Sequence, residues 1–180
     1  QQVVQHLLAL AEQMGLLDRR AKLLNGEIVN LSEQQAAVHA ALRMAHVSGG
    51  KGASSAMSQN CLDLDAMLTM AEAIRADSSI HDVVHMGIGG SSLGPELALQ
   101  ALRPYKSTQQ RLHVVSNLDG HDLAETLEQC DPANTLFIAA SKSWSTFETL
   151  QNLQSATEWL QRGGVNTTER VVAITAKPKA

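Results

Sequence analysis

The chain has 180 residues, of which 44% are apolar, 18% are charged and only 3% are aromatic. This length suits one domain with a sizeable aliphatic core, as in helix-rich or α/β proteins, and the composition excludes an intrinsically disordered chain. The formal charge of −4, without a basic stripe that carries interleaved aromatics, argues against a nucleic-acid partner.

The cysteines and the hydropathy of the chain indicate the cellular compartment in which the protein is expected. Cys61 and Cys130 lie in separate segments without metal-ligand spacing, so we expect reduced thiols, no disulfide and no bound metal. No apolar run is long enough to cross a membrane, and no charged segment precedes a short apolar one as in an export signal. We therefore expect a cytoplasmic protein without a membrane partner. Because the chain starts at Gln1 and has little after its last apolar run, we also expect a fragment of a longer protein.

The first 79 residues have helical patterns separated by polar segments. Apolar residues at helical spacing predict an amphipathic helix over 2–17, and Ser32-Glu33-Gln34-Gln35 has the form of a capping box before a helix over 36–44. Residues 48–58 are rich in Gly and Ser and predict a flexible loop, the best candidate for a linker. Helical spacing resumes over 64–74. We expect this region, 1–79, to pack on the domain that follows.

From residue 80 the pattern changes to apolar runs that alternate with helical segments. The runs predict parallel β-strands, and helices near 91–102, 120–130 and 146–162 supply the crossovers that parallel strands require. Because the runs are continuously apolar, both faces of the sheet should be covered. Residues 80–180 are therefore expected to form an α/β domain, a three-layer α/β/α sandwich. The predicted strands are Val83–Met86, Leu112–Val115, Leu136–Ala139 and Val171–Ile174.

A glycine-rich loop, Gly87-Ile88-Gly89-Gly90-Ser91-Ser92, follows the first predicted strand. Glycines let a ligand approach the backbone, and Ser91 or Ser92 can cap the next helix. A dinucleotide fingerprint would need Gly at position 92 and an acidic residue about 20 positions further on, so this loop does not predict a nucleotide cofactor. A tight turn without a ligand is the alternative.

A second loop, Ser141-Lys142-Ser143-Trp144-Ser145-Thr146, follows the third predicted strand. Ser145-Thr146-Phe147-Glu148 has the form of a capping box, so the next helix should begin near Thr146. The hydroxyls, the ammonium group and the helix N-terminus together favour a phosphate. Both loops are expected at the carboxyl edge of the sheet, where open α/β sheets bind ligands. The alternative is a set of helix caps and a solvated lysine.

The loop after the second strand, Ser116-Asn117-Leu118-Asp119-Gly120-His121, is a weaker signal. Asp119 could cap the next helix and His121 could transfer a proton, but a local turn is the better explanation. The other histidines show no metal-ligand clustering and no acid or base partner in the sequence. They are His6, His39, His46, His81, His85 and His113.

These residues resemble the glucose-6-phosphate isomerase family, whose members contain two SIS-type α/β domains. The similarity runs through 26–33, 36–43, 87–95, 115–120 and 136–149 and so covers most of the chain. The resemblance implies that Ser141, Lys142, Ser143 and Thr146 hold the substrate phosphate, and that Gly90 and Ser91 line the sugar side of the cleft.

The family interconverts glucose 6-phosphate and fructose 6-phosphate without a metal or cofactor, by moving a proton between C1 and C2 through a cis-enediol. The resemblance implies a homodimer in the intact protein, and a catalytic Glu, Arg, His and Lys in motifs that follow this segment. Ser92, Gln35 and Phe147 stand where the family often has Asp, Arg and Gln. The alternative from another functional class is a non-catalytic SIS module that senses a sugar phosphate.

Overall fold

The computed structural model describes residues 1–32, 34, 36–37, 39, 55–105 and 109–177, and for 55–63 it describes the main chain alone. The chain divides into two compact units, Gln1–Glu72 and Ala73–Ala180. The boundary between them falls inside helix α4 (Ser55–Ala76), whose last residues belong to the second unit.

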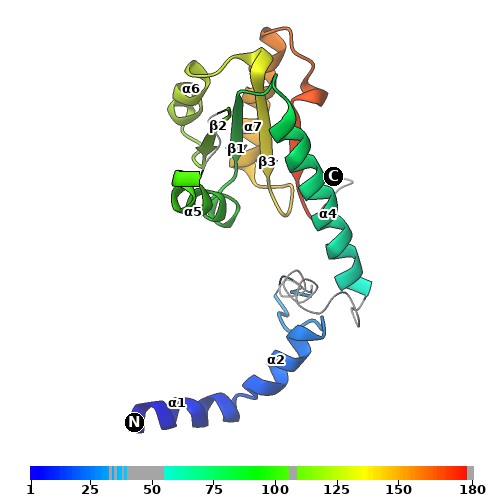
Figure 1. The fold of residues 1–180 in the computed structure, drawn as a ribbon. Coiled ribbons are helices and arrows are strands. Elements are labelled where there is room, and N and C mark those ends of the chain that lie inside the picture. The colour runs from blue at the N-terminus through cyan, green and yellow to red at the C-terminus, as the bar shows by residue number, and fades with distance from the viewer. Residues whose placement is uncertain (33, 35, 38, 40–54, 106–108, 178–180) are drawn as a thin grey trace. The chain divides into compact units, whose positions relative to one another are not determined.

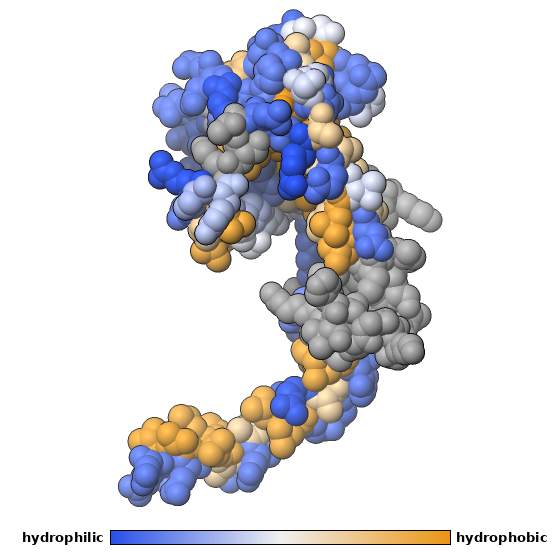
Figure 2. Space-filling view, in the orientation of Figure 1, coloured by the Kyte–Doolittle hydropathy of each residue, from blue (hydrophilic) through white to orange (hydrophobic). Residues whose placement is uncertain are grey.

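The N-terminal unit begins with two helices in place of the single predicted one. Helix α1 (Gln2–Gln13) and helix α2 (Leu16–Leu24) are separated at Gly15, which has a φ of 63°. The prediction of one helix over 2–17 was wrong because apolar spacing continues across a glycine that adopts the left-handed conformation, which other residues rarely do. The predicted apolar stripe is present and exposed, and Figure 2 shows it as an orange band along α1.

The predicted Gly/Ser-rich loop over 48–58 is contradicted at its C-terminal end. Its last residues, 55–58, form the first turn of α4, so the loop prediction was wrong there, and 48–54 lie outside the described residues. Most of the predicted helix over 36–44 also lies outside them, as do Glu33 and Gln35 of the predicted capping box. Among the helices described, none is both long and apolar enough to span a membrane.

The second unit contains a parallel sheet in the strand order β2-β1-β3-β4, drawn in Figure 1. Each predicted strand is confirmed to within one residue at either end. The observed bounds are β1 Asp82–Met86, β2 Arg111–Val115, β3 Thr135–Ala140 and β4 Val171–Ile174.

Helices connect the strands as predicted. They are α5 (Leu93–Ala101), α6 (Gly120–Glu128) and α7 (Phe147–Arg162), with short 3₁₀ turns at Gly89–Ser91, Arg103–Tyr105, Pro132–Asn134 and Thr167–Glu169. Within the sheet, the chain moves in one direction from β1 to β2 and in the opposite direction from β2 to β3. Because such crossovers are right-handed, α5 and α6 lie on opposite faces of the sheet. This arrangement confirms the three-layer α/β/α sandwich.

The two faces of the sheet have separate cores. Alternate residues of the central strands, Val84 and Phe137 among them, pack with Leu123 of α6 and Leu160 of α7. The other face packs Val83 and Leu136 against Ile74 near the end of α4. Phe137 is fully buried and meets the ring of Trp159 edge to face, with 6.0 Å between the ring centroids.

Replacing Phe137 by Ala is expected to lower the free energy of unfolding by about 3–5 kcal/mol, since it removes a buried aromatic ring and leaves a cavity. Chemical denaturation monitored by circular dichroism measures the change. Leu97→Ala in α5 is the matched control, because the Leu97 side chain is 69% exposed. Equal stability losses in the two variants would contradict the placement of Phe137 at the centre of this core.

Candidate functional site

The two hydroxyl-rich loops begin side by side at the carboxyl ends of β1 and β3. These strands pair in parallel, with Met86 opposite Ala139, so each loop leaves the same edge of the sheet. The chain passes from β1 outward to β2 and then back across β1 to β3. The β1/β3 boundary is therefore the point where the strand order reverses, and open α/β sheets bind their ligands at such a point.

Close contacts determine the shape of the glycine loop. A Cβ atom on Gly87 would lie 2.8 Å from the carbonyl oxygen of Ser91, so no other residue fits there without moving the loop. Gly89 has a φ of 56°, in the left-handed region that favours glycine. The same Ser91 carbonyl accepts a 2.7 Å hydrogen bond from His85 Nε2. His85, for which the sequence showed no partner, thus fixes the position of Ser91.

The serines after Gly90 differ in exposure and in role. Ser92 is buried, and although it occupies the N-cap position of α5, its hydroxyl donates back to the Gly89 carbonyl instead of accepting from the helix. Of the two serines that could cap α5, Ser91 or Ser92, Ser92 occupies the N-cap without making a capping hydrogen bond. Gly90 is exposed, and a Cβ atom there would have no heavy atom within 4 Å. An approaching ligand can reach the backbone at Gly90.

In the second loop the hydroxyls are linked in pairs. The buried Ser141 hydroxyl donates to Thr146 Oγ1 at 3.1 Å, and the Ser145 hydroxyl donates to Ser143 Oγ at 2.7 Å. Thr146 and Ser143 each accept from within the loop, so their own protons are available for an outside acceptor. Lys142 is exposed between these pairs, and its carbonyl accepts from the backbone N–H of Ala176.

The start of α7 lacks the capping box that the sequence predicted. The N-cap residue is Thr146 and not Ser145, and its side chain makes no capping hydrogen bond. The Thr146 hydroxyl is instead paired with Ser141. The first-turn N–H groups of this helix therefore have no side-chain cap, and with the helix dipole they form a site suited to an anion. Phe147, one of the departures from the family pattern, is 65% exposed at this position.

The third loop, after β2, has a local structural role. Asp119 caps α6, the role that the sequence allowed beside the preferred local turn, by accepting from the His121 N–H at 3.0 Å. The same carboxylate lies 3.0 Å from His121 Nδ1, and this hydrogen bond raises the pKa of the exposed His121. Asn152 of α7 donates to the Asn117 carbonyl at 2.8 Å and so ties this loop to the helix that begins at the phosphate-favouring loop.

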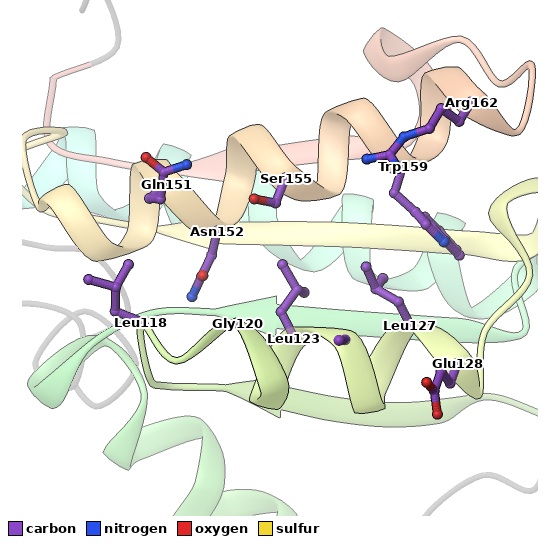
Figure 3. A pocket seen from close by; sticks show the side chains of 11 residues that line it. Leu118, Gly120, Leu123, Leu127, Glu128, Gln151, Asn152, Ser155, Trp159 and Arg162 are labelled. Atoms are coloured by element: carbon purple, nitrogen blue, oxygen red, sulfur yellow. The ribbon is translucent and has the colours of Figure 1, made fainter.

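A groove of about 500 Å³ lies on the face of the sheet that α6 and α7 cover. Figure 3 shows Leu118, Leu123 and Leu127 on one side of it, with Asn152 and Trp159 of α7 opposite. The groove includes none of the predicted phosphate or sugar contacts. The candidate site is thus the carboxyl edge of the sheet, and the groove is a separate feature.

One polar cluster was not recognisable from the sequence. Asp82, His113 and Cys130 come from three elements and meet at the amino end of the sheet, with a 2.8 Å contact between His113 Nε2 and Asp82 Oδ1. The expectation that His113 has no acid or base partner was wrong, because its Nε2 contacts the Asp82 carboxylate. The register that places β2 beside β1 was the missing information, because 31 residues separate Asp82 from His113.

Comparison with known proteins links the chain to one family. The sequence profile of phosphoglucose isomerase matches residues 1–180. The glucose-6-phosphate isomerase of Polaromonas naphthalenivorans is 42% identical in a match that covers 97% of this chain and 35% of the relative. The glucose-6-phosphate isomerase of Methylibium petroleiphilum is 46% identical in a match that covers 97% of this chain and 32% of the relative.

A solved structure supports the same relationship. The crystal structure of a glucose-6-phosphate isomerase from Chlamydia trachomatis superposes with a TM-score of 0.79 and 29% identity, over 93% of this chain and 33% of that one. The chain thus spans about a third of the length of the relatives it matches. With its profile matched along the whole sequence and its sheet superposed on a solved member, the chain belongs to the phosphoglucose isomerase family.

Proposed function

We propose that this chain is the phosphate-binding part of a glucose-6-phosphate isomerase, which interconverts glucose 6-phosphate and fructose 6-phosphate. The observation that carries the proposal is the pair of loops at the β1/β3 boundary, one open at Gly90 and the other ending at the uncapped start of α7. The relatives from Polaromonas naphthalenivorans and Methylibium petroleiphilum, which are named glucose-6-phosphate isomerase, support this proposal.

In this proposal the substrate phosphate binds at the N-terminus of α7. Ser143 and Thr146 donate their hydroxyl protons, Ser141 orients Thr146 through their hydrogen bond, and the Lys142 ammonium group offsets the phosphate charge. The helix N-terminus adds about half a positive charge and N–H donors without a side-chain cap. Gly90 and Ser91 then line the sugar, because the neighbouring loop starts at the paired strand.

The chemistry requires residues beyond this phosphate site. Transfer of a proton between C1 and C2 through a cis-enediol needs a base, which the family resemblance assigns to a Glu, and an Arg that stabilises the enediol charge. We propose that the family's Glu, Arg, His and Lys come from motifs that follow this segment. We also propose that the intact protein is a cytoplasmic homodimer that uses no cofactor, as the resemblance implies.

In the full-length protein, Lys142→Ala is expected to raise KM by about tenfold to a hundredfold with a smaller change in kcat. A hydrogen bond to a charged group contributes about 1.5–3 kcal/mol, and the phosphate is remote from the bonds that change. Steady-state kinetics with fructose 6-phosphate in a coupled assay measures both constants. Lys22→Ala in α2 is the control, and an unchanged KM for Lys142→Ala would show that Lys142 does not bind phosphate.

Purified residues 1–180 alone are expected to show no isomerase activity. A general acid or base contributes about 10²–10⁴ to a rate, and the proposed base and enediol-stabilising Arg belong to other motifs. A coupled assay with glucose 6-phosphate, run beside the full-length protein, measures the difference. Turnover by the purified segment at the rate of the full-length protein would show that these residues carry the catalytic groups.

A crystal grown with sulfate or a sugar phosphate is expected to show an anion at the start of α7, within hydrogen-bonding distance of Ser143 and Thr146. The hydroxyl loop has charge-assisted donors, whereas the glycine loop lacks a cation of its own. Difference density measures the position. An anion bound at Gly87–Ser92, with the second loop empty, would reverse the roles of the two loops.

A further inference from the structure

Three side chains with metal-binding atoms meet at the amino end of the sheet. Asp82 is the first residue of β1, His113 lies in β2, and Cys130 follows the end of α6. Their ligand atoms all lie within 4.8 Å of one another, and within the described part of the chain no other residues form such a group. The cluster lies on the face of the sheet that α6 covers, at the end opposite the proposed phosphate site.

Two of the three distances are close to those that a tetrahedral zinc ion requires, and the third, between the Asp82 carboxylate and Cys130 Sγ, is at most 4.8 Å and must close by up to about 1.3 Å. His113 Nε2 lies 2.8 Å from Asp82 Oδ1 and 3.9 Å from Cys130 Sγ. Zinc bonds of about 2.0–2.3 Å to O, N and S ligands put neighbouring ligand atoms about 3.3–3.7 Å apart. To bind zinc, the distance between His113 Nε2 and Asp82 Oδ1 must therefore increase by about half an ångström, and the distance between His113 Nε2 and Cys130 Sγ must decrease by about as much. Small side-chain rotations can produce both changes.

The surroundings hold Asp82 as a charged ligand. Its side chain is 1% exposed, and burial disfavours the carboxylate, but hydrogen bonds from Arg111 and His113 outweigh that effect and lower the pKa of Asp82. Arg111 Nη2 contacts the other oxygen, Oδ2, at 2.8 Å and also donates to the Gln129 carbonyl. Oδ1 is thereby fixed toward His113, in the way that outer hydrogen bonds orient metal ligands.

We propose that Asp82 Oδ1, His113 Nε2 and Cys130 Sγ form a Zn²⁺ site, with water in the fourth position. Zn²⁺ is a borderline-soft ion that binds carboxylate, imidazole and thiolate ligands, whereas Mg²⁺ and Ca²⁺ prefer oxygen ligands alone. The two anionic ligands neutralise the charge of the ion. The strands of the sheet separate the site from the phosphate loops by about 13 Å, which is the length of β1 at its usual rise per residue.

Binding requires a defined exchange of protons. Burial raises the pKa of the Cys130 thiol to about 11, so the metal-free side chain is a thiol whose proton passes to water when sulfur binds zinc. The proton on His113 Nε2 leaves as that nitrogen binds the ion, and Nδ1 carries one in its place. Each Zn²⁺ bound to a neutral His113 therefore releases one proton.

The proposal is tested by titrating the untagged full-length protein that carries this chain with Co²⁺, then with Zn²⁺. We expect a near-ultraviolet thiolate-to-cobalt band that saturates at one ion per chain, is abolished by Zn²⁺ and persists in excess Mg²⁺. Cys130→Ser should remove the band and weaken Co²⁺ binding at least about tenfold. Cys61→Ser is the matched control, and it should keep both the cobalt band and the Co²⁺ affinity.

A second measurement needs no variant. Zn²⁺ should slow alkylation of Cys130 by N-ethylmaleimide at least about tenfold, as located by peptide mass mapping, while the rate at Cys61 stays unchanged. Absence of the cobalt band, its survival in Cys130→Ser, or equal alkylation rates with and without Zn²⁺ would each overturn the proposal. The cluster would then be an ion-pair network that joins β1 to β2.

Discussion

The parallel pairing of β1 with β3 is the constraint on which the candidate site depends. Two loops that lie more than 50 positions apart in the sequence leave one edge together because Met86 is paired with Ala139. Neither loop is a convincing site alone, since glycine turns and helix caps are common in α/β proteins. Their juxtaposition at the point where the strand order reverses makes a phosphate and a sugar contact possible in one ligand.

Short-range contacts then fix what each loop offers. In the glycine loop, the Ser91 carbonyl approaches Gly87 and accepts from His85, so a residue inside the sheet positions a residue at its edge. In the second loop, Ser143 and Thr146 accept hydrogen bonds from Ser145 and Ser141, which leaves their own protons available for an outside acceptor. Backbone N–H groups without a side-chain cap complete an arrangement that favours a doubly charged anion over a neutral ligand.

The opposite end of the same strands has a different chemistry. A buried carboxylate at the start of β1 bridges to Arg111 and His113 of β2, with Cys130 beside them. A buried carboxylate persists in a protein when it is paired, and Asp82 has an ion pair with Arg111 and a hydrogen bond from His113. The sheet thus has hydroxyls and an uncapped helix N-terminus at its carboxyl edge and a buried Asp-His-Cys cluster at its amino end, separated by the apolar core around Val84 and Phe137.

The sequence by itself determined the elements that local patterns specify. Continuous apolar runs predicted the strands, and in the central β1 and β3 they are buried on both faces. The edge strands β2 and β4 remain partly exposed, so the expectation that both faces are covered was wrong there. The glycine and hydroxyl loops, and with them the family, were also recognisable from their local sequence. The prediction failed where a single residue changed the local conformation. At Gly15 the left-handed conformation divides a helix that the apolar spacing predicted to continue.

Only the tertiary structure decided the contacts between distant segments. The Ser145 capping box was wrong because α7 begins one residue later, with Thr146 as its N-cap, and because the Ser145 and Thr146 hydroxyls form hydrogen bonds with Ser143 and Ser141 inside the loop. Likewise, His85 and His113 had no partners in the sequence, since the Ser91 carbonyl and Asp82 reach them through a turn and through strand register. The local sequence pattern predicts secondary structure and burial. Hydrogen-bond partners depend instead on which strands become neighbours in the sheet.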